Sequence, residues 1–159
     1  ISNFEAADGL YANTSFRVYG LDLNHKHLPE VQKWGGLEHA PLLVPSVGNF
    51  RQGMIVQVPL QLWSLPGSPS PEDVHAALAS HYAGQRFITV KSLAETGKMT
   101  GFGPEGLNGT NELHLYVFRN DEMGQVVVMG LIDNLGKGAS GQAVQNLNLM
   151  IGAPQDVGF

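Results

Sequence analysis

The stretch "VVVMGLIDNLGKGASGQAVQNLNLM", residues 126–150, decides between two classes of fold. The apolar run at 126–132 predicts a strand, and the apolar residues at 144, 147 and 150 predict a helix after a glycine-rich turn. Gly136, Gly138 and Gly141 in that turn have the G-x-G-x-x-G spacing of a dinucleotide-binding fingerprint. The pattern therefore raises the question of a Rossmann fold.

The sequence around this turn argues against a Rossmann fold. A dinucleotide-binding unit needs a second strand and an acidic residue about 20 positions after the glycines. No strand-like run follows Gly141, and Asp156 lies in a proline-containing tail. We interpret the turn as a strand-to-helix connection in which glycines permit close backbone packing. An anion or amide contact at the helix start remains open.

The rest of the chain predicts an α+β fold with a mostly antiparallel sheet and helices on one face. Most neighbouring strands are joined by connections too short for a crossover helix. The predicted strands are 15–20, 41–47, 53–65, 86–90 and a hairpin of 112–120 with 124–133. The predicted helices are a short one opened by Pro29 and Glu30, and two longer ones at 68–84 and 139–151.

The helix at 68–84 carries the clearest local signals. Ser70 is a suitable N-cap and Pro71 suits the first turn. The residues predicted to form one buried stripe are spaced i, i+3, i+4 and i+7, and they are Val74, Ala77, Leu78 and His81.

Composition excludes several classes of function. The 159 residues suit one domain, 43% are hydrophobic, and the net charge of −5 argues against a nucleic-acid-binding surface. No apolar run approaches the roughly 20 residues of a membrane-spanning helix, and the first residues lack the features of a secretory signal. The absence of cysteine excludes disulfides, thiolate metal sites and thiol catalysis within this chain.

A pair of histidines in "NHKHLPE", residues 24–30, is one candidate site. If residues 22–27 are extended, the rings of His25 and His27 point to the same side, where they could act as general acid and base. No third ligand at a matching spacing is evident, so we expect no metal. Polar surface histidines are the structural alternative.

Arg51 in "VPSVGNFRQGM", residues 44–54, is a second candidate. Its planar guanidinium can bind a phosphate or a carboxylate, but a plain loop before a long strand explains this segment equally well.

Taken together, four segments resemble one enzyme family. In order and spacing, "NHKHLPE", "VPSVGNFRQGM", "LNGTNELHLYVF" and "LIDNLGKGASGQAVQNLNLM" are similar to the carboxyl-terminal part of N-acetyl-gamma-glutamyl-phosphate reductase, in its shorter form. The resemblance covers residues 1–152.

The resemblance implies a fold like that of the glyceraldehyde-3-phosphate dehydrogenase group. In that family an amino-terminal Rossmann domain binds NADP, and an α+β domain carries catalysis and subunit contacts. It implies NADPH-dependent reduction of N-acetyl-glutamyl 5-phosphate to the 5-semialdehyde, in arginine biosynthesis in the cytoplasm, by a homo-oligomer (dimer or tetramer). Residues 1–138 would form the catalytic and dimerisation domain. Residues 139–159 would pack toward the Rossmann domain.

The resemblance also implies roles for individual residues. His27, slightly favoured over His25, would be the acid/base group. Asn134 would contact the nicotinamide carboxamide, with Gly136 and Gly138 beside the cofactor. The nucleophile of the family is a cysteine in a Gly-Cys-Tyr segment, which would lie upstream of Ile1. We therefore expect the chain alone to be inactive.

Two other functions remain open. The chain could be a non-catalytic oligomerisation module, and the apolar run at 53–65 with Trp63 near its end is the feature that favours this. It could also belong to a reductase for a homologous amino-acid acyl phosphate.

Overall fold

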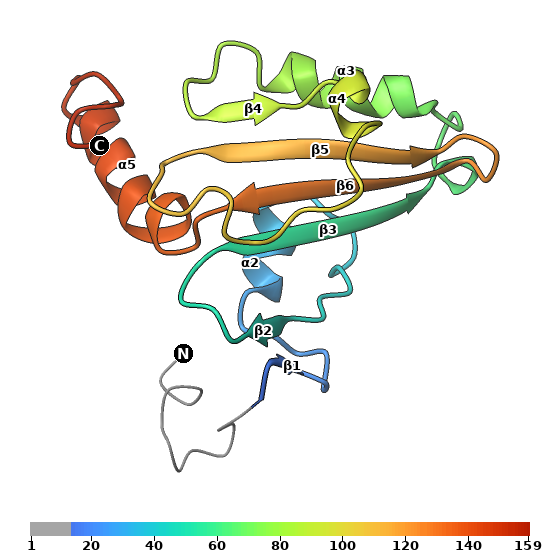
Figure 1. Cartoon of the computed structure of the whole chain (residues 1–159), viewed down its shortest axis with the longest axis horizontal. Coiled ribbons are helices and arrows are strands. Elements are labelled where there is room, and N and C mark those ends of the chain that lie inside the picture. The colour runs from blue at the N-terminus through green and yellow to red at the C-terminus, as the bar shows by residue number, and fades with distance from the viewer. Residues whose placement is uncertain (1–13) are drawn as a thin grey trace. The chain divides into compact units, whose positions relative to one another are not determined.

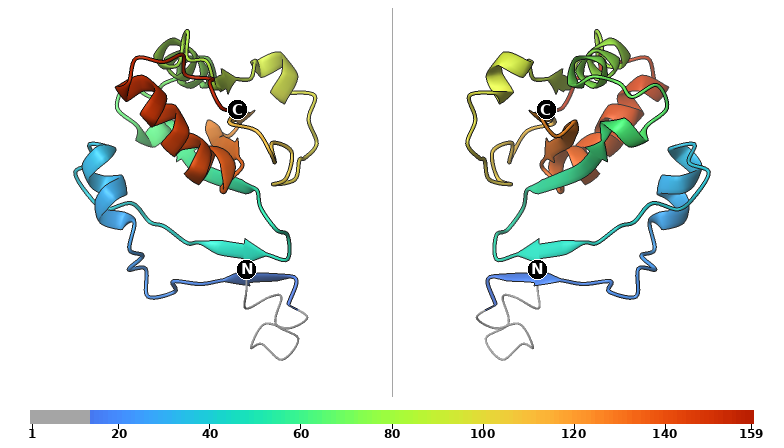
Figure 2. Two further views of the ribbon diagram at one scale, coloured as in Figure 1. Left: turned by 90° about the vertical axis from the view of Figure 1, so that its left-hand side faces the viewer. Right: turned by 90° about the vertical axis from the view of Figure 1, so that its right-hand side faces the viewer.

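The computed structural model describes residues 14–159, and these residues form two compact units that divide between Arg51 and Gln52. In the first unit, β1(Phe16–Val18) pairs antiparallel with β2(Ser46–Gly48), as Figure 2 shows. Helix α2(Leu28–Trp34) lies between them in the sequence. The prediction of a strand over 41–47 is wrong for residues 41–45. Pro41 and Pro45 lack the N–H that a ladder requires.

The second unit is built on a four-stranded sheet in the order β3-β6-β5-β4 (Figure 1). The strands are β3(Met54–Gln61), β4(Ile88–Val90), β5(Leu113–Asn120) and β6(Gln125–Ile132). Strand β6 pairs antiparallel with both β3 and β5, whereas β4 pairs parallel with β5. The predicted α+β class with a mostly antiparallel sheet is confirmed, and the one parallel pair was not predicted.

The long apolar run at 53–65 is only partly a strand. Strand β3 ends at Gln61, and the chain continues as a 3-10 turn, η1(Leu62–Ser64). Leu62 turns inward and is 3% exposed, whereas Trp63 is 64% exposed. The backbone N–H of Leu62 donates to the carbonyl of Gly124 at 2.9 Å, so the turn closes on the β5–β6 connection.

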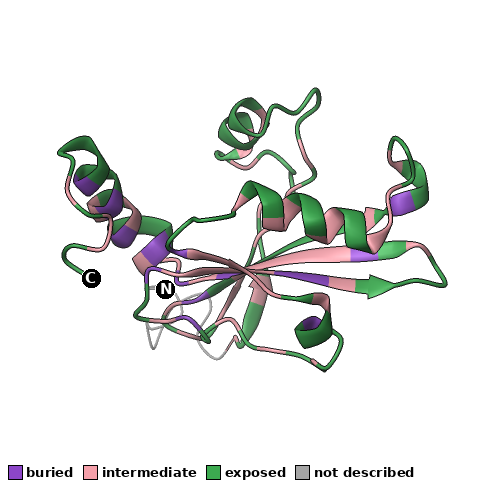
Figure 3. Ribbon diagram, turned by 90° about the horizontal axis from the view of Figure 1, so that it is seen from above, coloured by how far each residue is buried: buried purple, intermediate pink, exposed green. Residues whose placement is uncertain are grey.

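Each face of this sheet has its own apolar cluster, and Figure 3 shows the buried positions. On one face, Leu62, Val117 and Val126 pack against side chains of α3(Pro71–His81). On the other face, Tyr116 and Leu131 are covered by residues from the 97–111 connection. This connection follows a short helix, α4(Leu93–Thr96), inside the segment for which no helix was predicted.

Helix α3 begins as the sequence predicts. The Ser70 hydroxyl accepts from the backbone N–H of Asp73 at 3.1 Å, and the Asp73 carboxylate accepts from the backbone N–H of Ser70 at 2.8 Å. These reciprocal bonds form a capping box.

The buried stripe of α3 is wrong for two of its four residues. Val74 and Leu78 pack against the core, but Ala77 and His81 are exposed. The inward side passes instead through His75, whose Nε2 lies 3.1 Å from the carbonyl oxygen of Lys91. Val74, His75 and Leu78 are spaced i, i+1 and i+4. The inward side of α3 is therefore rotated toward His75, away from the predicted stripe.

The last helix, α5(Gly141–Met150), follows a π-helical turn, η2(Gly136–Ser140). Its polarity is inverted, because the residues that it buries are Gly141, Gln145 and Asn148. Leu147 and Leu149 are each 54% exposed, and Met150 is 84% exposed. The buried amides bond to the tail, where Asn148 Nδ2 donates to the carbonyl of Val157 at 2.8 Å.

Candidate functional site

The two predicted histidines lie in the turn between β1 and α2 of the first unit. The segment is not extended, because the backbone N–H of Leu28 donates to the carbonyl of His25 at 3.0 Å and closes a tight turn. The rings of His25 and His27 nevertheless lie together, with centroids 5.1 Å apart and planes inclined by 46°. A turn, not a strand, therefore brings the pair together.

Hydrogen bonds within the turn give the two rings opposite polarity. Nδ1 of His25 accepts from the backbone N–H of His27 at 3.3 Å, so a neutral His25 carries its proton on Nε2. Nδ1 of His27 lies 3.0 Å from Oε2 of Glu30. A carboxylate only accepts, so His27 carries its proton on Nδ1. Neutral His27 thus presents a lone pair at Nε2, and neutral His25 presents an N–H.

Glu30 is a residue of this site that sequence reasoning missed. The sequence pointed to it only as part of the start of a short helix, although its i+3 spacing from His27 is the signal that could have revealed the contact. The side chains of His27 and Glu30 are 53% and 69% exposed. An exposed pair of this kind adds little stability, so its main effect is to orient the ring.

The turn after β6 in the second unit is organised by Asp133, which is 1% exposed. Its Oδ1 accepts from the backbone N–H groups of Leu135 and Gly136, at 2.9 and 3.0 Å. Its Oδ2 accepts from Gln52 Nε2 at 2.7 Å and from the backbone N–H of Gly109 at 2.8 Å. One carboxylate therefore joins three segments that are distant in the sequence.

The protonation of Asp133 follows from these contacts. Burial by itself would raise the pKa of this carboxyl group, because it disfavours the charged form. The bonds from Gly109, Gly136, Leu135 and Gln52 outweigh burial and hold the pKa of Asp133 below its ordinary value of 3.8. Asp133 is therefore a carboxylate at neutral pH, with four donors around it.

Asn134 is held by the same segment. Its Oδ1 accepts from the backbone N–H of Gly53 at 2.7 Å. Because a backbone N–H can only donate, the amide oxygen must face Gly53 and the amide nitrogen must face the other way. Gly53 itself has φ +109°, and a side chain there would overlap the carbonyl oxygen of Pro104, so the position requires glycine.

The glycines of the turn are explained by packing within the chain. A Cβ on Gly136 would lie 2.8 Å from the carbonyl oxygen of Thr110, and one on Gly138 would lie 3.2 Å from Ile132 Cδ1. A Cβ on Gly141 would overlap Oδ1 of Asn111. The interpretation of the turn as a closely packed strand-to-helix connection agrees with these contacts. Cofactor contact by Gly136 or Gly138 stays a prediction.

Lys137, in the middle of this turn, points inward and is 9% exposed. Its Nζ donates to Gln145 Oε1 at 2.6 Å and lies 5.5 Å from the centre of the Phe87 ring. Burial lowers the pKa of this lysine. The ammonium group is engaged within the chain, so it stabilises the start of α5.

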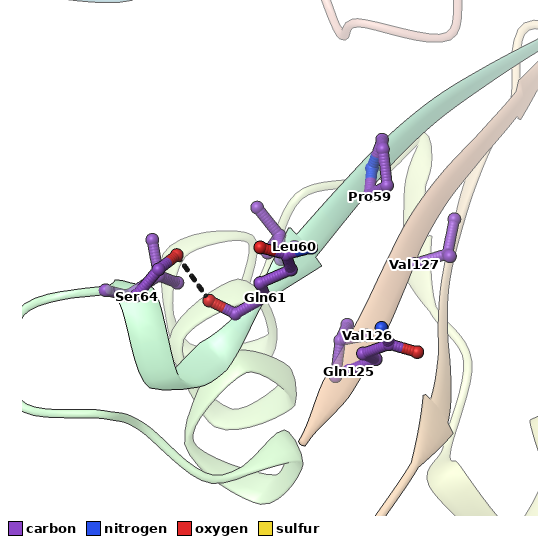
Figure 4. A pocket seen from close by; sticks show the side chains of 8 residues that line it. Pro59, Leu60, Gln61, Ser64, Gln125, Val126 and Val127 are labelled. Atoms are coloured by element: carbon purple, nitrogen blue, oxygen red, sulfur yellow. Dashed lines mark hydrogen bonds between the residues drawn. The ribbon is translucent and has the colours of Figure 1, made fainter. Parts of the chain in front are cut away.

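Two hollows lie at opposite ends of the sheet. One of about 520 Å³ borders the turn and is lined by Asn111, Gly136, Gly141 and two aromatic residues, Phe87 and Phe159. The other, of about 470 Å³, lies where β3 meets β6 at Gln61 and Gln125 (Figure 4). Its polar groups are amides and the Ser64 hydroxyl, which donates to the carbonyl of Gln61 at 2.7 Å. It holds no acid or base.

Arg51, the remaining candidate, is exposed in the bend before β3. Within residues 14–159, no group of three His, Asp or Glu side chains could hold a metal ion. None of the helices described is long and apolar enough to cross a membrane.

Comparison with known proteins identifies relatives that share one name. A family model described as "Semialdehyde dehydrogenase, dimerisation domain" matches residues 4–134. N-acetyl-gamma-glutamyl-phosphate reductase of Burkholderia cenocepacia is 48% identical over 153 residues, which cover 96% of this chain and 49% of that protein.

Two further relatives have the same name. The protein of Trichormus variabilis is 43% identical over 158 residues, covering 98% of this chain and 49% of the relative. The protein of Brucella ovis is 54% identical over 135 residues, which cover 85% of this chain and 44% of that relative. The chain thus spans about half the length of these curated relatives.

The resemblance found in the sequence motifs is confirmed by these comparisons. The matched region, residues 4–134, includes the histidine turn, all four strands of the larger sheet and the first residues of the Asp133 turn. It ends before α5(Gly141–Met150). This chain therefore belongs to the semialdehyde dehydrogenase dimerisation-domain family.

Proposed function

We propose that this chain is the carboxyl-terminal, catalytic and dimerising part of a reductase that converts N-acetyl-glutamyl 5-phosphate to N-acetyl-glutamate 5-semialdehyde, with NADPH, in the cytoplasm. Relatives that bear the name N-acetyl-gamma-glutamyl-phosphate reductase support it. The observation that carries the proposal is the orientation of His27 by Glu30, which leaves a lone pair on Nε2.

His27 would act on a cysteine from the part of the enzyme outside this chain. Its Nε2 would accept the thiol proton, and the resulting thiolate would attack the acyl carbon and expel phosphate, leaving a thioester. The bound nicotinamide cofactor would supply the hydride. Protonated His27 would donate to the oxygen that becomes negative, giving a thiohemiacetal. Return of that proton to His27 and cleavage of the carbon–sulfur bond would then release the aldehyde and regenerate the thiolate. Glu30, bonded to Nδ1, would keep the ring in one orientation during both proton transfers.

The second unit would hold one end of the cofactor. Asn134 Nδ2 has no hydrogen-bond acceptor among the residues that the structure describes, so it fits a ligand that carries an acceptor, such as a nicotinamide carboxamide. Gly136 and Gly138 would let the ring approach the backbone. The inward direction of Lys137 leaves this contact to Asn134 and the backbone.

The exposed side of α5 supports a separate role for residues 139–159. Leu147, Met150 and Ile151 follow i, i+3, i+4 spacing and are 54%, 84% and 68% exposed. Apolar side chains on one helix face are typical of a docking surface. We propose that this face packs on the nucleotide-binding domain, while residues 1–138 form the catalytic and dimerisation domain of a dimer or tetramer.

The test uses the complete reading frame that carries this segment. NADPH oxidation with N-acetyl-glutamyl 5-phosphate should occur with the complete protein and not with the 159-residue chain, which has no cysteine. His27→Ala should lower kcat about 10²- to 10⁴-fold, the usual contribution of a general acid/base group. His39→Ala, a change of the same kind at an exposed residue, should leave kcat unchanged.

Three results would contradict the proposal. Full activity of His27→Ala would remove the acid/base role. A higher kcat/KM for the acyl phosphate with one more methylene would favour the reductase for a homologous amino acid. A complete protein that oligomerises but binds neither NADPH nor acyl phosphate would favour the non-catalytic oligomerisation module. The 64% exposed Trp63 is the feature that supports this alternative.

A further inference from the structure

A chemically reactive pair of residues lies beside the Asp133 turn. Asn108 and Gly109 form the one Asn-Gly pair in the sequence. In such a pair the backbone nitrogen of the glycine, which no side chain shields, can attack the side-chain carbonyl carbon of the asparagine. Gly109 lies at φ +75°, a conformation that favours glycine, and it is exposed to water. The turn therefore requires the residue that makes the pair reactive.

The reaction is deamidation, and its steps define which atoms must be free. The nitrogen of Gly109 loses its proton and bonds to Cγ of Asn108, the Cγ–Nδ2 bond breaks, and the proton and the NH₂ group leave as ammonia. Water then opens the succinimide ring that remains, which leaves aspartate or isoaspartate at position 108. The atoms that decide the rate are the attacking nitrogen, the leaving Nδ2, and Oδ1, which becomes negative during the attack.

In the folded chain all of these atoms are held away from the reaction. The backbone N–H of Gly109 donates to Oδ2 of Asp133 at 2.8 Å. Nδ2 of Asn108 donates to the carbonyl of Gln52 at 3.2 Å, which holds the amide in one orientation. Oδ1 of Asn108 is buried, and no donor among the described residues reaches it. Negative charge on that oxygen would therefore have no hydrogen bond to stabilise it.

The Asp133 carboxylate is the strongest of these constraints. It is 1% exposed, so the bond from Gly109 is made to a buried negative charge. To attack, the Gly109 nitrogen must give up this bond and lose a proton close to that charge, and both changes are unfavourable. A hydrogen bond to a charged group is worth a factor of about 10 to 150 in an equilibrium.

From this geometry we propose that Asn108–Gly109 is a latent deamidation site, which the Asp133 carboxylate keeps closed while the turn is folded. The product does not fit the closed turn. Aspartate at position 108 turns an oxygen toward the Gln52 carbonyl, and isoaspartate lengthens the backbone and displaces the Gly109 N–H from Asp133. A molecule that reacts once therefore cannot close the turn again. This inference does not depend on the proposed function.

The test follows deamidation in the tryptic peptide of residues 99–119. The complete protein and the isolated peptide are incubated at the same mildly alkaline pH, and mass spectrometry measures the replacement of NH₂ by OH. Asn111, which precedes a glutamate in the same peptide, is the internal reference. We expect Asn108 to react at least about tenfold more slowly in the folded protein than in the peptide. Equal rates would overturn the proposal.

Variants separate the effect of the carboxylate from that of folding in general. Asp133→Asn turns its NH₂ group toward Gly109, because the other orientation would face two backbone N–H groups of its own turn. It should accelerate deamidation of Asn108 about 10- to 150-fold, up to the rate of the peptide. Leu62→Ala, in the core on the opposite face of the sheet, is the control at a matched loss of Tm. Equal acceleration by both variants, well below Tm, would assign the protection to global folding and refute the role of Asp133.

A measurement on the unchanged protein covers the case in which Asp133→Asn does not fold. The Gly109 amide should exchange its hydrogen with solvent at least about tenfold more slowly than in the peptide, since it is bonded to a buried carboxylate. Asn108→Asp, the product itself, should lower Tm, whereas Asn146→Asp, the same change on an exposed residue of α5, should not. Exchange at the peptide rate, or an unchanged Tm for Asn108→Asp, would contradict the closed turn.

Discussion

Asp133→Asn is expected to destabilise the chain strongly, although the two side chains have nearly the same shape. The carboxylate accepts four hydrogen bonds, two at each oxygen. Asparagine keeps one oxygen, and its NH₂ group must face two donors at the other position. The Gln52 amide can turn over to accept, but the backbone N–H of Gly109 cannot.

The cost follows from what is lost. A hydrogen bond to a charged group is worth about 1.5–3 kcal/mol, and a buried donor left unsatisfied costs about 1–3 kcal/mol. The Gln52 amide can keep a hydrogen bond by turning over, whereas the backbone N–H of Gly109 loses its acceptor. The free energy of unfolding should therefore fall by about 2–4 kcal/mol. Urea unfolding followed by circular dichroism measures this, because both tryptophans, at 79% and 64% exposed, make fluorescence a weak probe.

The stability contributed by Asp133 should depend on pH. The pKa of Asp133 is lower in the folded chain than its ordinary value of 3.8, so its carboxylate stabilises the fold above that value. That stability is lost as the pH falls through the lower folded pKa. The difference in stability between the unchanged chain and the Asp133→Asn variant should therefore be full at pH 7 and shrink below about pH 3.8.

The control is Asp121→Asn, whose carboxylate is 62% exposed. An exposed carboxylate of this kind contributes little, so its removal should change stability by less than about 0.5 kcal/mol. Were Asp133→Asn to cost no more than this control at neutral pH, the hydrogen bonds could not be organising the turn as described.

Three further outcomes follow from the structure. Gly141→Ala should lower the free energy of unfolding of the chain by about 1–3 kcal/mol, because the added methyl group overlaps Asn111 Oδ1. Gly103→Ala, which has open space around it, is the control and should have no such cost; urea unfolding measures both. Ser70→Ala should cost about 1 kcal/mol through loss of the capping box, seen as a lower Tm. Met150→Gln should weaken association with a separately produced amino-terminal half, measured by calorimetry, and an unchanged Kd would reject the docking role of α5.

Local signals predicted the fold where one segment determines its own structure. The capping box at Ser70 and the proline after it set the start of α3, and both lie within four residues. The β5–β6 hairpin was predicted because its strands are adjacent in sequence. The parallel pairing of β4 with β5 was missed because register between separated segments leaves no local pattern.

The candidate site, like the fold, was predicted only where the signal lies within one short segment. The histidine pair was evident from its spacing, but its geometry comes from a turn closed by His25 and Leu28. Asp133 was not recognised as an organising group, since Gln52 lies 81 residues away and Gly109 lies 24 residues away. A carboxylate whose partners are this distant looks, in the sequence, like any other acid beside an asparagine.

The inverted polarity of α5 has a consequence for the order of assembly during synthesis. Asn148 Nδ2 bonds the carbonyl oxygens of Gln155 and Val157, at 3.3 and 2.8 Å, and both residues leave the ribosome after it. Until they emerge, the inward side of the helix carries unsatisfied amides, and its outer side carries leucines. Packing of α5 against the tail is therefore a late event, and a nascent chain paused near residue 150 exposes apolar side chains to which a chaperone can bind.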